Sequence, residues 1–293
     1  MLNLAVAYRE ETFERVRDPL ADRGIRAVHV PTEARTVDLA DPPWDPDEFD
    51  VGFVYPSRAM EGGAVDALLD VPWVNDREAV LTSRNKAGVI AALGREGVAV
   101  PETVLVSNPV DEDELCAAFE RFDGPVVVKP NSTTRGVGVA RVDDLDSFLG
   151  ITDYLDLVHD YRATGDKSFL VQEYLPGATD YRAMVVDGEY AGAVERRLPA
   201  DALAAGQWKH NVHRGATARG VDLRPKLRDV AERTAEALDV PFLGVDLLET
   251  EDRVVVNETN ARSTVDAETK YEEGFYDALA ELIRRVAGSA TRR

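Results

Sequence analysis

Hydrophobic positions in the first 80 residues form short runs separated by amphipathic and polar stretches. Apolar runs with the length of buried strands lie at 2–8, 25–30 and 51–56. Helical spacing is found at 10–23 and 64–69, and the stretch 31–50 is rich in proline and aspartate, as loops often are. Strands that alternate with helices favour a parallel sheet, so the pattern predicts an N-terminal βαβ unit over residues 1–80.

Downstream of this unit the pattern changes to longer helices and paired strands. Helical spacing is found at 83–93, 111–122, 144–149, 225–238 and 272–286. Strand-like runs lie at 125–129, 137–142, 169–173, 184–186, 189–195, 244–249 and 254–258. Asp187-Gly188 separates two of these runs and favours a tight hairpin. The mixture of elements predicts an α/β (α+β) protein.

The net charge of the chain limits the classes of function that fit the sequence. The 293 residues carry a net charge of −20, and they include 28 arginines but only six lysines. This balance is typical of a salt-adapted, halophilic protein, whose surface carboxylates keep it soluble when salt screens other charges; an ordinary acidic protein is the alternative. Because phosphate contacts need a basic face, the charge argues against a nucleic-acid partner.

The sequence also favours a cytoplasmic protein. No stretch approaches the roughly 20 apolar residues of a membrane span. No basic region precedes the first apolar run, as a signal peptide would require. The single cysteine, Cys116, cannot form an internal disulfide and suits a reducing compartment. Its place in an amphipathic helix predicts that it packs in a core.

Two strands near the C-terminus carry candidate metal ligands. Asp246 lies in the first strand, and Glu258 and Asn260 lie two residues apart in the second, so these two side chains share a face. Hard oxygen ligands of this kind suit Mg²⁺, with phosphate and water completing its coordination. The alternative is a pair of acidic strand ends on an acidic surface, which fits less well because both strands are otherwise apolar.

A lysine and a glycine-containing loop form a second candidate feature. Lys129 ends the apolar run 126–130 and precedes a loop that contains Gly136 and Gly138. A lysine inside an apolar strand needs an anionic partner, which either a phosphate or a carboxylate would supply. The loop's N–H groups could cover phosphates, although two glycines alone fit any turn. The loop is neither a Walker loop nor a dinucleotide fingerprint.

Cations gather between residues 180 and 215. They include Arg182, Arg196, Arg197, Lys209 and Arg214. Concentrated cations in so acidic a chain suggest a site for a triphosphate or a carboxylate substrate, with surface ion pairs as the alternative, notably for Arg196. His210 and His213 have no nearby cysteine or third histidine, which argues against zinc.

Taken in order, these residues resemble the ATP-grasp superfamily and, within it, the RimK-type glutamate ligases. The resemblance runs from about residue 74 to the C-terminus. Its motifs are Asn85-Lys86, the run ending at Lys129-Pro130, the glycine loop, Gln172-Glu173-Tyr174, Asp180-Tyr181-Arg182, Asn211 with His213-Arg214-Gly215, Gly244-Val245-Asp246 and Asn257-Glu258-Thr259-Asn260. Each motif is weak alone, whereas the ordered set is specific.

The resemblance implies an ATP-grasp fold, with ATP held between two lobes. Its parts would be a pre-ATP-grasp domain at 1–80, a small lobe with the glycine loop at 81–176 and a C-terminal lobe with the metal site at 177–293. The ATP-binding residues would be Lys86, Lys129, Gly136, Gly138, Glu173, Tyr174, Asp180, Lys209 and Asn211. Asp246, Glu258 and Asn260 would bind two Mg²⁺ or Mn²⁺ ions. Arg182, Arg197 or Arg214 would neutralise the reacting acylphosphate.

The implied reaction is ATP-dependent amide formation between a carboxylate and an amine. We expect glutamate or another amino acid to be added to a small molecule, a cofactor tail or a carrier protein, by a homodimer or homotetramer. Arg262-Ser263-Thr264 replaces small residues that are common in the family, so Arg262, Lys270 or Tyr271 would read the substrate. A non-catalytic ATP-binding module and a phosphotransferase are the alternatives.

Overall fold

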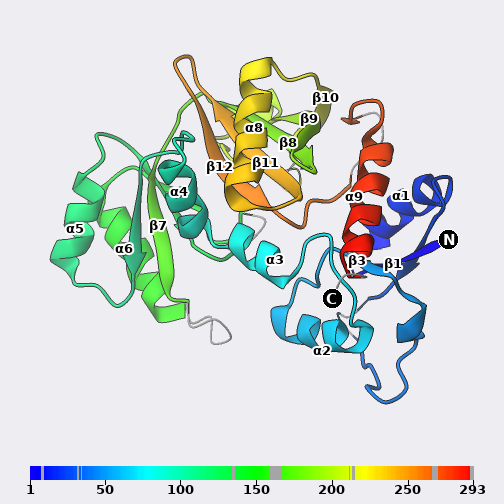
Figure 1. The fold of residues 1–293 in the computed structure, drawn as a ribbon. Helices are drawn as coiled ribbons and strands as arrows, with labels where there is room; N and C mark the ends of the chain where they lie inside the picture. Colours follow the sequence, from blue (N-terminus) through cyan, green and yellow to red (C-terminus); the bar gives the residue numbers. More distant parts are fainter. Residues whose placement is uncertain are drawn as a thin grey trace.

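The described part of the chain folds around three sheets, which Figure 1 shows side by side. A computed structural model describes residues 1–7, 10–31, 33, 35–133, 136–158, 166–210, 212, 215–265 and 270–290. The first sheet is parallel and has the order β2-β1-β3. It is built from β1 (Leu2–Val6), α1 (Glu10–Ala21), β2 (Ile25–His29), η1 (Pro46–Glu48), β3 (Val51–Phe53) and α2 (Ala59–Leu69). The predicted N-terminal βαβ arrangement is confirmed.

A four-stranded sheet forms the small lobe. Its strand order is β4 (Thr103–Ser107), β7 (Ser168–Glu173), β5 (Val126–Pro130) and β6 (Ala140–Val142). Alternate side chains of these strands pack against α5 (Glu112–Glu120) and α6 (Leu145–Val158) in one hydrophobic cluster. Because the helices cover one face, the side chains of Val127, Lys129 and Leu170 belong to the opposite face.

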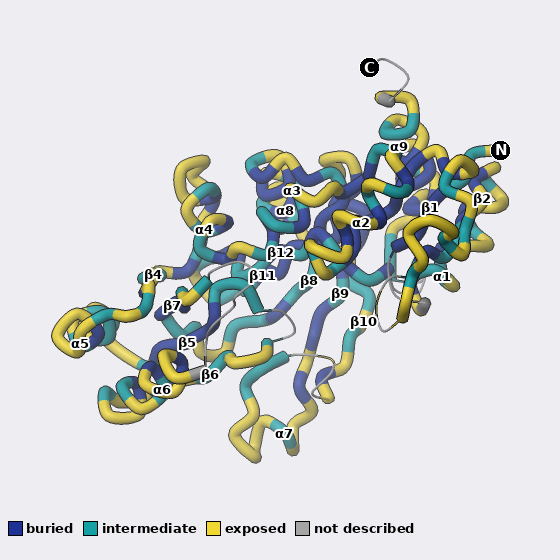
Figure 2. The backbone as a smooth tube through the Cα atoms, turned by 90° about the horizontal axis from the view of Figure 1, so that it is seen from below, coloured by how far each residue is buried: buried dark blue, intermediate teal, exposed yellow. Residues whose placement is uncertain are grey.

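A five-stranded antiparallel sheet forms the large lobe. Its strand order is β10 (Thr217–Val221), β9 (Glu189–Arg197), β8 (Thr179–Val186), β11 (Phe242–Glu249) and β12 (Val254–Asn260). Helices α7 (Ala200–Ala204), α8 (Pro225–Leu238) and α9 (Phe275–Ala290) complete this part of the chain. The β8–β9 hairpin turns at Asp187-Gly188, as predicted. In the burial view of Figure 2, α7 stands out as exposed beside the largely buried β9.

The N-terminal unit and the large lobe share one hydrophobic core. Buried side chains from β1, β3, β8, β11, α8 and α9 belong to a single cluster, whereas the small lobe has its own. Helices α3 (Arg77–Arg84) and α4 (Lys86–Arg95) contact α8 and β12 of the large lobe. The segment that the resemblance placed at the start of the small lobe therefore packs with the large one.

Local signals explain where the helices near the site begin. Asp76 caps α3 by accepting a hydrogen bond from the Ala79 N–H, and Asn85 caps α4 by accepting one from Gly88. The first residue of α4 is Lys86, so this cap fixes the start of the helix that carries the lysine. Asn131 reinforces the same turn, since its Oδ1 accepts from the Ala87 N–H at 2.8 Å.

Candidate active site

Asp246 and Glu258 face one another across β11 and β12. The two residues are paired in the ladder, and Asp246 is only 5 % exposed. Glu258 forms an ion pair with Lys86, whose Nζ lies 3.3 Å from Oε1. Two positions along the ladder Gly244 pairs with Asn260, so all three predicted metal ligands lie along one face. The Asn260 Oδ1 also accepts a hydrogen bond from the Arg262 N–H at 2.9 Å.

A β-bulge brings the two carboxylates together. The ladder pairs Asp246 with Glu258 but the next residue, Leu247, with Val256, so Asn257 is an extra residue. In a regular ladder Asp246 would oppose Asn257, and Glu258 would point to the other face. The extra residue also serves the site, because the carbonyl and side-chain oxygens of Asn257 accept from Lys129 Nζ at 3.4 and 3.3 Å.

Two arginines neutralise the carboxylates of this face. Arg182 holds Asp246 with two hydrogen bonds, from Nε to Oδ1 at 2.6 Å and from Nη2 to Oδ2 at 2.7 Å. Arg196 bridges two carboxylates, with Nη2 lying 2.6 Å from Asp180 and 3.0 Å from Asp246. Paired geometry of this kind is the strongest that an arginine makes with a carboxylate.

The pKa values of the two aspartates move in opposite directions. Burial is the largest influence on Asp180 and raises its pKa to about 7, against the opposing effect of Arg196. Burial disfavours the charge on Asp246 as well, but Arg182 and Arg196 together outweigh it and lower the pKa of Asp246 to about 2. Asp246 is therefore a carboxylate at neutral pH.

The structure does not bring Arg197 into this group. Its side chain is 73 % exposed and pairs with Glu195, on the opposite face of β9 from Arg196. Sequence reasoning selected Arg197 and left Arg196 open to a surface role. The signal that could have separated them is Gly192, because a lone glycine inside a strand pattern suggests a bulge, and a bulge at this place changes the register of the hairpin.

Lys86 and Lys129 lie where the two lobes meet, and both are buried. Lys86 Nζ donates to the carbonyl oxygens of Asn131, at 3.4 Å, and Thr133, so it contacts the start of the glycine loop as well as Glu258. Burial is the main influence on Lys129 and lowers its pKa to about 8. The lysines thus connect the loop of the small lobe to the acidic pair of the large lobe.

Gly136 and Gly138 have conformations that favour glycine. Their φ angles are +66° and +75°, and a Cβ on Gly138 would lie 2.8 Å from Pro130 Cγ. The glycines therefore let the loop fold back over the end of β5. Lys209 Nζ donates to the Val139 carbonyl oxygen, which joins this region to the large lobe.

Glu173 is the last residue of β7, and Tyr174 follows it. The Glu173 carboxylate accepts from the Glu102 N–H at 2.7 Å and pairs with Arg253 at 2.5 Å. This side chain therefore links the small lobe to the β11–β12 turn of the large lobe. The Tyr174 ring meets Trp208 edge-on, with centroids 5.7 Å apart. Trp208 had no predicted role. The predicted residues Asn211 and Arg214, with His213, lie outside the described residues.

The face has an excess of positive charge. Its described carboxylates are Asp180, Asp246 and Glu258, and its described cations are Lys86, Lys129, Arg182 and Arg196. One cation more than the carboxylates, in a chain of net charge −20, makes this a site suited to an anion. Hard oxygens on the same face suit a divalent cation that arrives with that anion.

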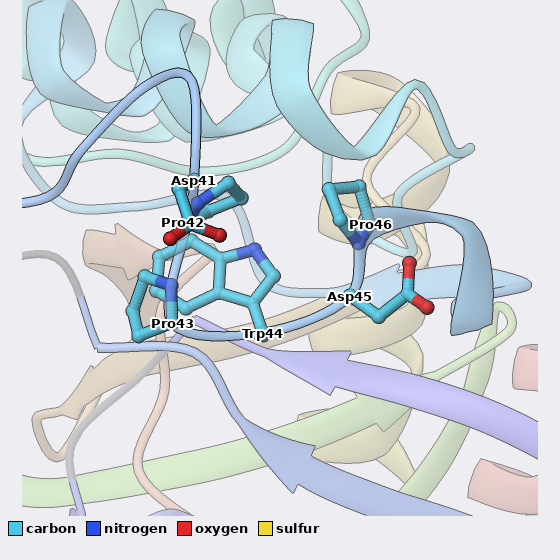
Figure 3. Close-up of a pocket in the computed structure, with 6 residues that line it drawn as sticks. All are labelled: Asp41, Pro42, Pro43, Trp44, Asp45 and Pro46. Carbon is cyan, nitrogen blue, oxygen red and sulfur yellow. The ribbon is translucent and has the colours of Figure 1, made fainter.

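A hollow elsewhere lacks these properties. It has a volume of about 430 Å³ and lies in the N-terminal unit, as Figure 3 shows. Its lining residues are Asp41, Pro42, Pro43, Trp44, Asp45 and Pro46. Two carboxylates and no cation among them would repel a triphosphate.

Comparisons with known proteins show which family the chain belongs to. The sequence profile of the RimK-like ATP-grasp domain matches residues 83–285, and the chain belongs to this family. A probable alpha-L-glutamate ligase of Thioalkalivibrio sulfidiphilus is 31 % identical over 197 residues, which cover 64 % of the chain and 58 % of that relative. The match thus spans less than two thirds of the relative's length.

Solved structures share the fold across almost the whole chain. D-alanine–D-alanine ligase from Bacillus anthracis, complexed with ATP, has a TM-score of 0.69 at 14 % identity and covers 100 % of this chain and 99 % of its own. A RimK domain ATP-grasp protein from Sphaerobacter thermophilus has a TM-score of 0.67 at 22 % identity, covering 96 % and 99 %. The α/β (α+β) ATP-grasp fold is thereby confirmed.

Within the described part of the chain, no helix is both long and apolar enough to cross a membrane.

Proposed function

We propose that the protein is an ATP-dependent carboxylate–amine ligase that forms an amide bond through an acylphosphate. One observation carries the proposal: four cations from both lobes gather around two bulge-paired carboxylates, next to a glycine loop. Family membership supports it, and the relative from Thioalkalivibrio sulfidiphilus is named as a probable alpha-L-glutamate ligase.

The phosphates of ATP would lie between the lysines and the glycine loop. Lys86 and Lys129 would exchange their present oxygen partners for phosphate oxygens, and the loop around Gly136 and Gly138 would cover them. Lys209 and Asn211 would lie near the γ-phosphate. These groups bind and orient the triphosphate and need no proton transfer.

The adenine would lie against the uncovered face of the small sheet. Val127 and Leu170 are buried there but belong to neither hydrophobic core, which leaves their side chains to form a wall between the lobes. The backbone at Glu173 and Tyr174 would face the edge of the base, and Asp180 would hold the ribose. To bind the ribose, Asp180 would have to give up part of its ion pair with Arg196.

Asp246, Glu258 and Asn260 would hold Mg²⁺ or Mn²⁺, since two carboxylates and an amide are the hard oxygen ligands that such ions prefer. When bound, the metal would neutralise phosphate charge. Arg182 and Arg196 already contact Asp246 and would turn toward the transferred phosphoryl group. Arg196 thereby takes the role that the sequence assigned to Arg197, while the proposed role of Arg214 is kept.

The chemistry would then run in two steps. The substrate carboxylate attacks the γ-phosphorus, ADP leaves, and the acylphosphate forms; the amine next attacks the acyl carbon, phosphate leaves and the nitrogen loses a proton. The arginines and lysines stabilise the charge that develops on phosphoryl oxygens in both steps. Before the reaction, carboxylates hold Lys86, Arg182 and Arg196 in place, and Asn257 holds Lys129.

The acceptor would bind between the large lobe and the N-terminal unit. Arg262 follows the candidate metal ligands and donates to the Tyr55 carbonyl oxygen at the end of β3. Ligands of parallel sheets commonly bind at the carboxyl ends of the strands. Arg262, Lys270 and Tyr271 would read the substrate, with glutamate or another amino acid as the amine and a small molecule or carrier protein as the acceptor.

The composition further supports a salt-adapted cytoplasmic enzyme, and we expect a homodimer or homotetramer. Carboxylates in excess keep a surface hydrated when salt screens its charges. Activity and stability should therefore rise with KCl concentration.

The first experiment measures ADP release from Mg²⁺–ATP at high KCl across a matrix of amino acids and carboxylate acceptors. Mass spectrometry of the products should show a new amide, and ADP release should require both substrates. ADP release with a stable phosphorylated product and no need for an amine would indicate a phosphotransferase. ATP binding without turnover, even after addition of cell extract as a source of carrier protein, would indicate a binding module.

A further inference from the structure

The β8–β9 hairpin contains an extra residue that decides which arginine reaches the site. Next to the turn, Val186 pairs with Glu189 and Val185 with Tyr190, but Met184 then pairs with Gly192. Ala191 is therefore the extra residue of a β-bulge. Beyond it the ladder is regular, and Asp180 pairs with Arg196.

Without this bulge the site would receive the wrong charges. A regular ladder from the same turn would place Glu195 opposite Asp180 and put Arg197 on the face of Arg182. Two carboxylates directly opposite one another are unfavourable, and Arg196 would point to the other face. The extra residue thus puts Arg196 on the face of the site and turns Glu195 and Arg197 to the opposite face.

The bulge is held by a segment that lies far away in sequence. Gly192 has a φ of +127°, and a Cβ at this position would lie 2.6 Å from Tyr271 Cα and 3.1 Å from the Lys270 carbonyl oxygen. The Glu272 N–H donates to the Ala191 carbonyl oxygen at 3.1 Å. Only glycine fits here, because both the backbone conformation and the close approach exclude a side chain.

Helix α8 holds the other side of the bulge. The Glu232 carboxylate accepts from the Tyr190 N–H at 2.9 Å, and the Arg228 guanidinium lies 4.5 Å from the centre of the Tyr190 ring. Arg228 also pairs with Glu272 at 3.0 Å, which ties the helix to the segment on the opposite side. The bulge is therefore clamped by two elements.

We infer that Gly192 is a positioning residue: with the backbone of Tyr271 and Glu272, it fixes the bulge that aims Arg196 at Asp180 and Asp246. The inference rests on the proposed function for its catalytic consequence, since Arg196 matters to the rate only if this face binds the phosphates. It extends the site to a contact on the far side of the hairpin.

The test compares two glycines of the same hairpin. Gly192→Ala should lower kcat for ADP release by roughly 100-fold, as expected when an aimed cationic donor is lost, and should raise KM for ATP. Gly188→Ala is the matched control, because Gly188 also has a positive φ, of +85°, but a Cβ there would meet nothing within 4 Å. Its KM and kcat should stay within about 3-fold of the wild type, because a Cβ there strains only the exposed turn and makes no clash with another segment. Equal kinetics of the two variants would overturn the inference.

Deletion of Ala191 gives a rescue that a purely structural role would not produce. Removing the extra residue leaves a regular ladder in which Met184 still opposes Gly192 and Asp180 still opposes Arg196. The deletion should therefore restore at least about 10-fold of the lost rate to Gly192→Ala, because residue 192 no longer needs its special conformation and the bulge that presses it against Tyr271 is gone. If Gly192→Ala does not fold, the deletion alone should keep Arg196 aimed and retain activity; loss to the level of Arg196→Ala would contradict the inference.

A measurement without turnover separates this inference from the proposed function. In a Cys116→Ser background, Ala183→Cys with Ala193→Cys places two thiols on directly paired residues. A disulfide should form readily and should be lost when Gly192→Ala is added. If the wild type shows no ligase activity but this pattern is found, the proposed function fails and the bulge assignment stands. Unchanged crosslinking after Gly192→Ala would refute the assignment itself.

Discussion

The two antiparallel sheets that enclose the site supply charge in different ways. The small sheet is regular in its described pairs, and β5 contributes one charged side chain, Lys129, at the end of three buried valines. The large sheet contains two bulges and directs Asp180, Arg182, Arg196, Asp246 and Glu258 to one face. A regular ladder can place a lone charge at its end, whereas gathering five charges from four strands required two changes of register.

Removing the acidic pair of the large sheet should have the largest effect. Glu258→Gln and Asp246→Asn should each lower kcat by about 1000-fold, because the amide lacks the negative charge and one of the two oxygens that the carboxylate would offer to the metal. Asp246→Asn should also lower the melting temperature, since breaking a buried ion pair costs about 3–5 kcal/mol. ADP release and thermal unfolding measure the two effects. Full activity in either variant would contradict the metal assignment.

Replacing each of the two neighbouring arginines in turn by alanine tests the bulge of β9. Arg196→Ala should reduce kcat/KM for ATP by roughly 100-fold, since its guanidinium bridges Asp180 and Asp246. Arg197→Ala should change stability by less than about 1 kcal/mol and leave the kinetics unaltered, because its pair with Glu195 is at the surface. If Arg197→Ala instead had the larger effect on kcat/KM, the hairpin would not have this register.

The lone charge of the small sheet should give a pH dependence. Burial lowers the pKa of Lys129 to about 8, so the free protein loses this positive charge as pH rises through that value. Affinity for ATP should consequently fall by about 10-fold per pH unit above the pKa, as expected for binding that requires the protonated form. KM for ATP measured across this range is the readout. Lys129→Arg should remove the dependence, because a guanidinium stays protonated.

Loss of the Glu173–Arg253 ion pair between the lobes should have the smallest effect. Arg253→Ala removes the ion pair to Glu173, in which the arginine side chain is 40 % exposed, so the loss should be below about 1 kcal/mol. KM for ATP should stay close to the wild-type value. A large rise in KM would mean that this contact sets the closure of the lobes, and that the two sheets are coupled more strongly than their separate cores indicate.

Much of the site could be predicted from the sequence because its parts are local. Lys129 at the end of an apolar run, the positive-φ glycines after it and the spacing of Glu258 and Asn260 are properties of short segments. The secondary structure followed from the periods of the apolar positions for the same reason. Boundaries shifted where tertiary contacts intervened, as in the terminal helix, which was expected at 272–286 and is observed as Phe275–Ala290.

Register was the part that the sequence left open. Whether Arg196 or Arg197 joins Asp180 depends on one extra residue at Ala191, and whether Glu258 joins Asp246 depends on Asn257. Gly192 inside β9 is a local sign of a bulge, but it does not say which neighbouring residue is the extra one. Each bulge is decided by distant contacts, with Tyr271 and Glu272 in one case and Lys129 in the other.

The chain by itself thus determined which elements form and which residue types are available for phosphate and metal, because both depend on neighbours within a few positions. The tertiary structure decided which of those residues meet. A side chain in a strand points to one of two faces, and a single inserted residue reverses that choice for everything beyond it. Contacts from other parts of the fold, such as the backbone of Tyr271 against Gly192, make the insertion stable.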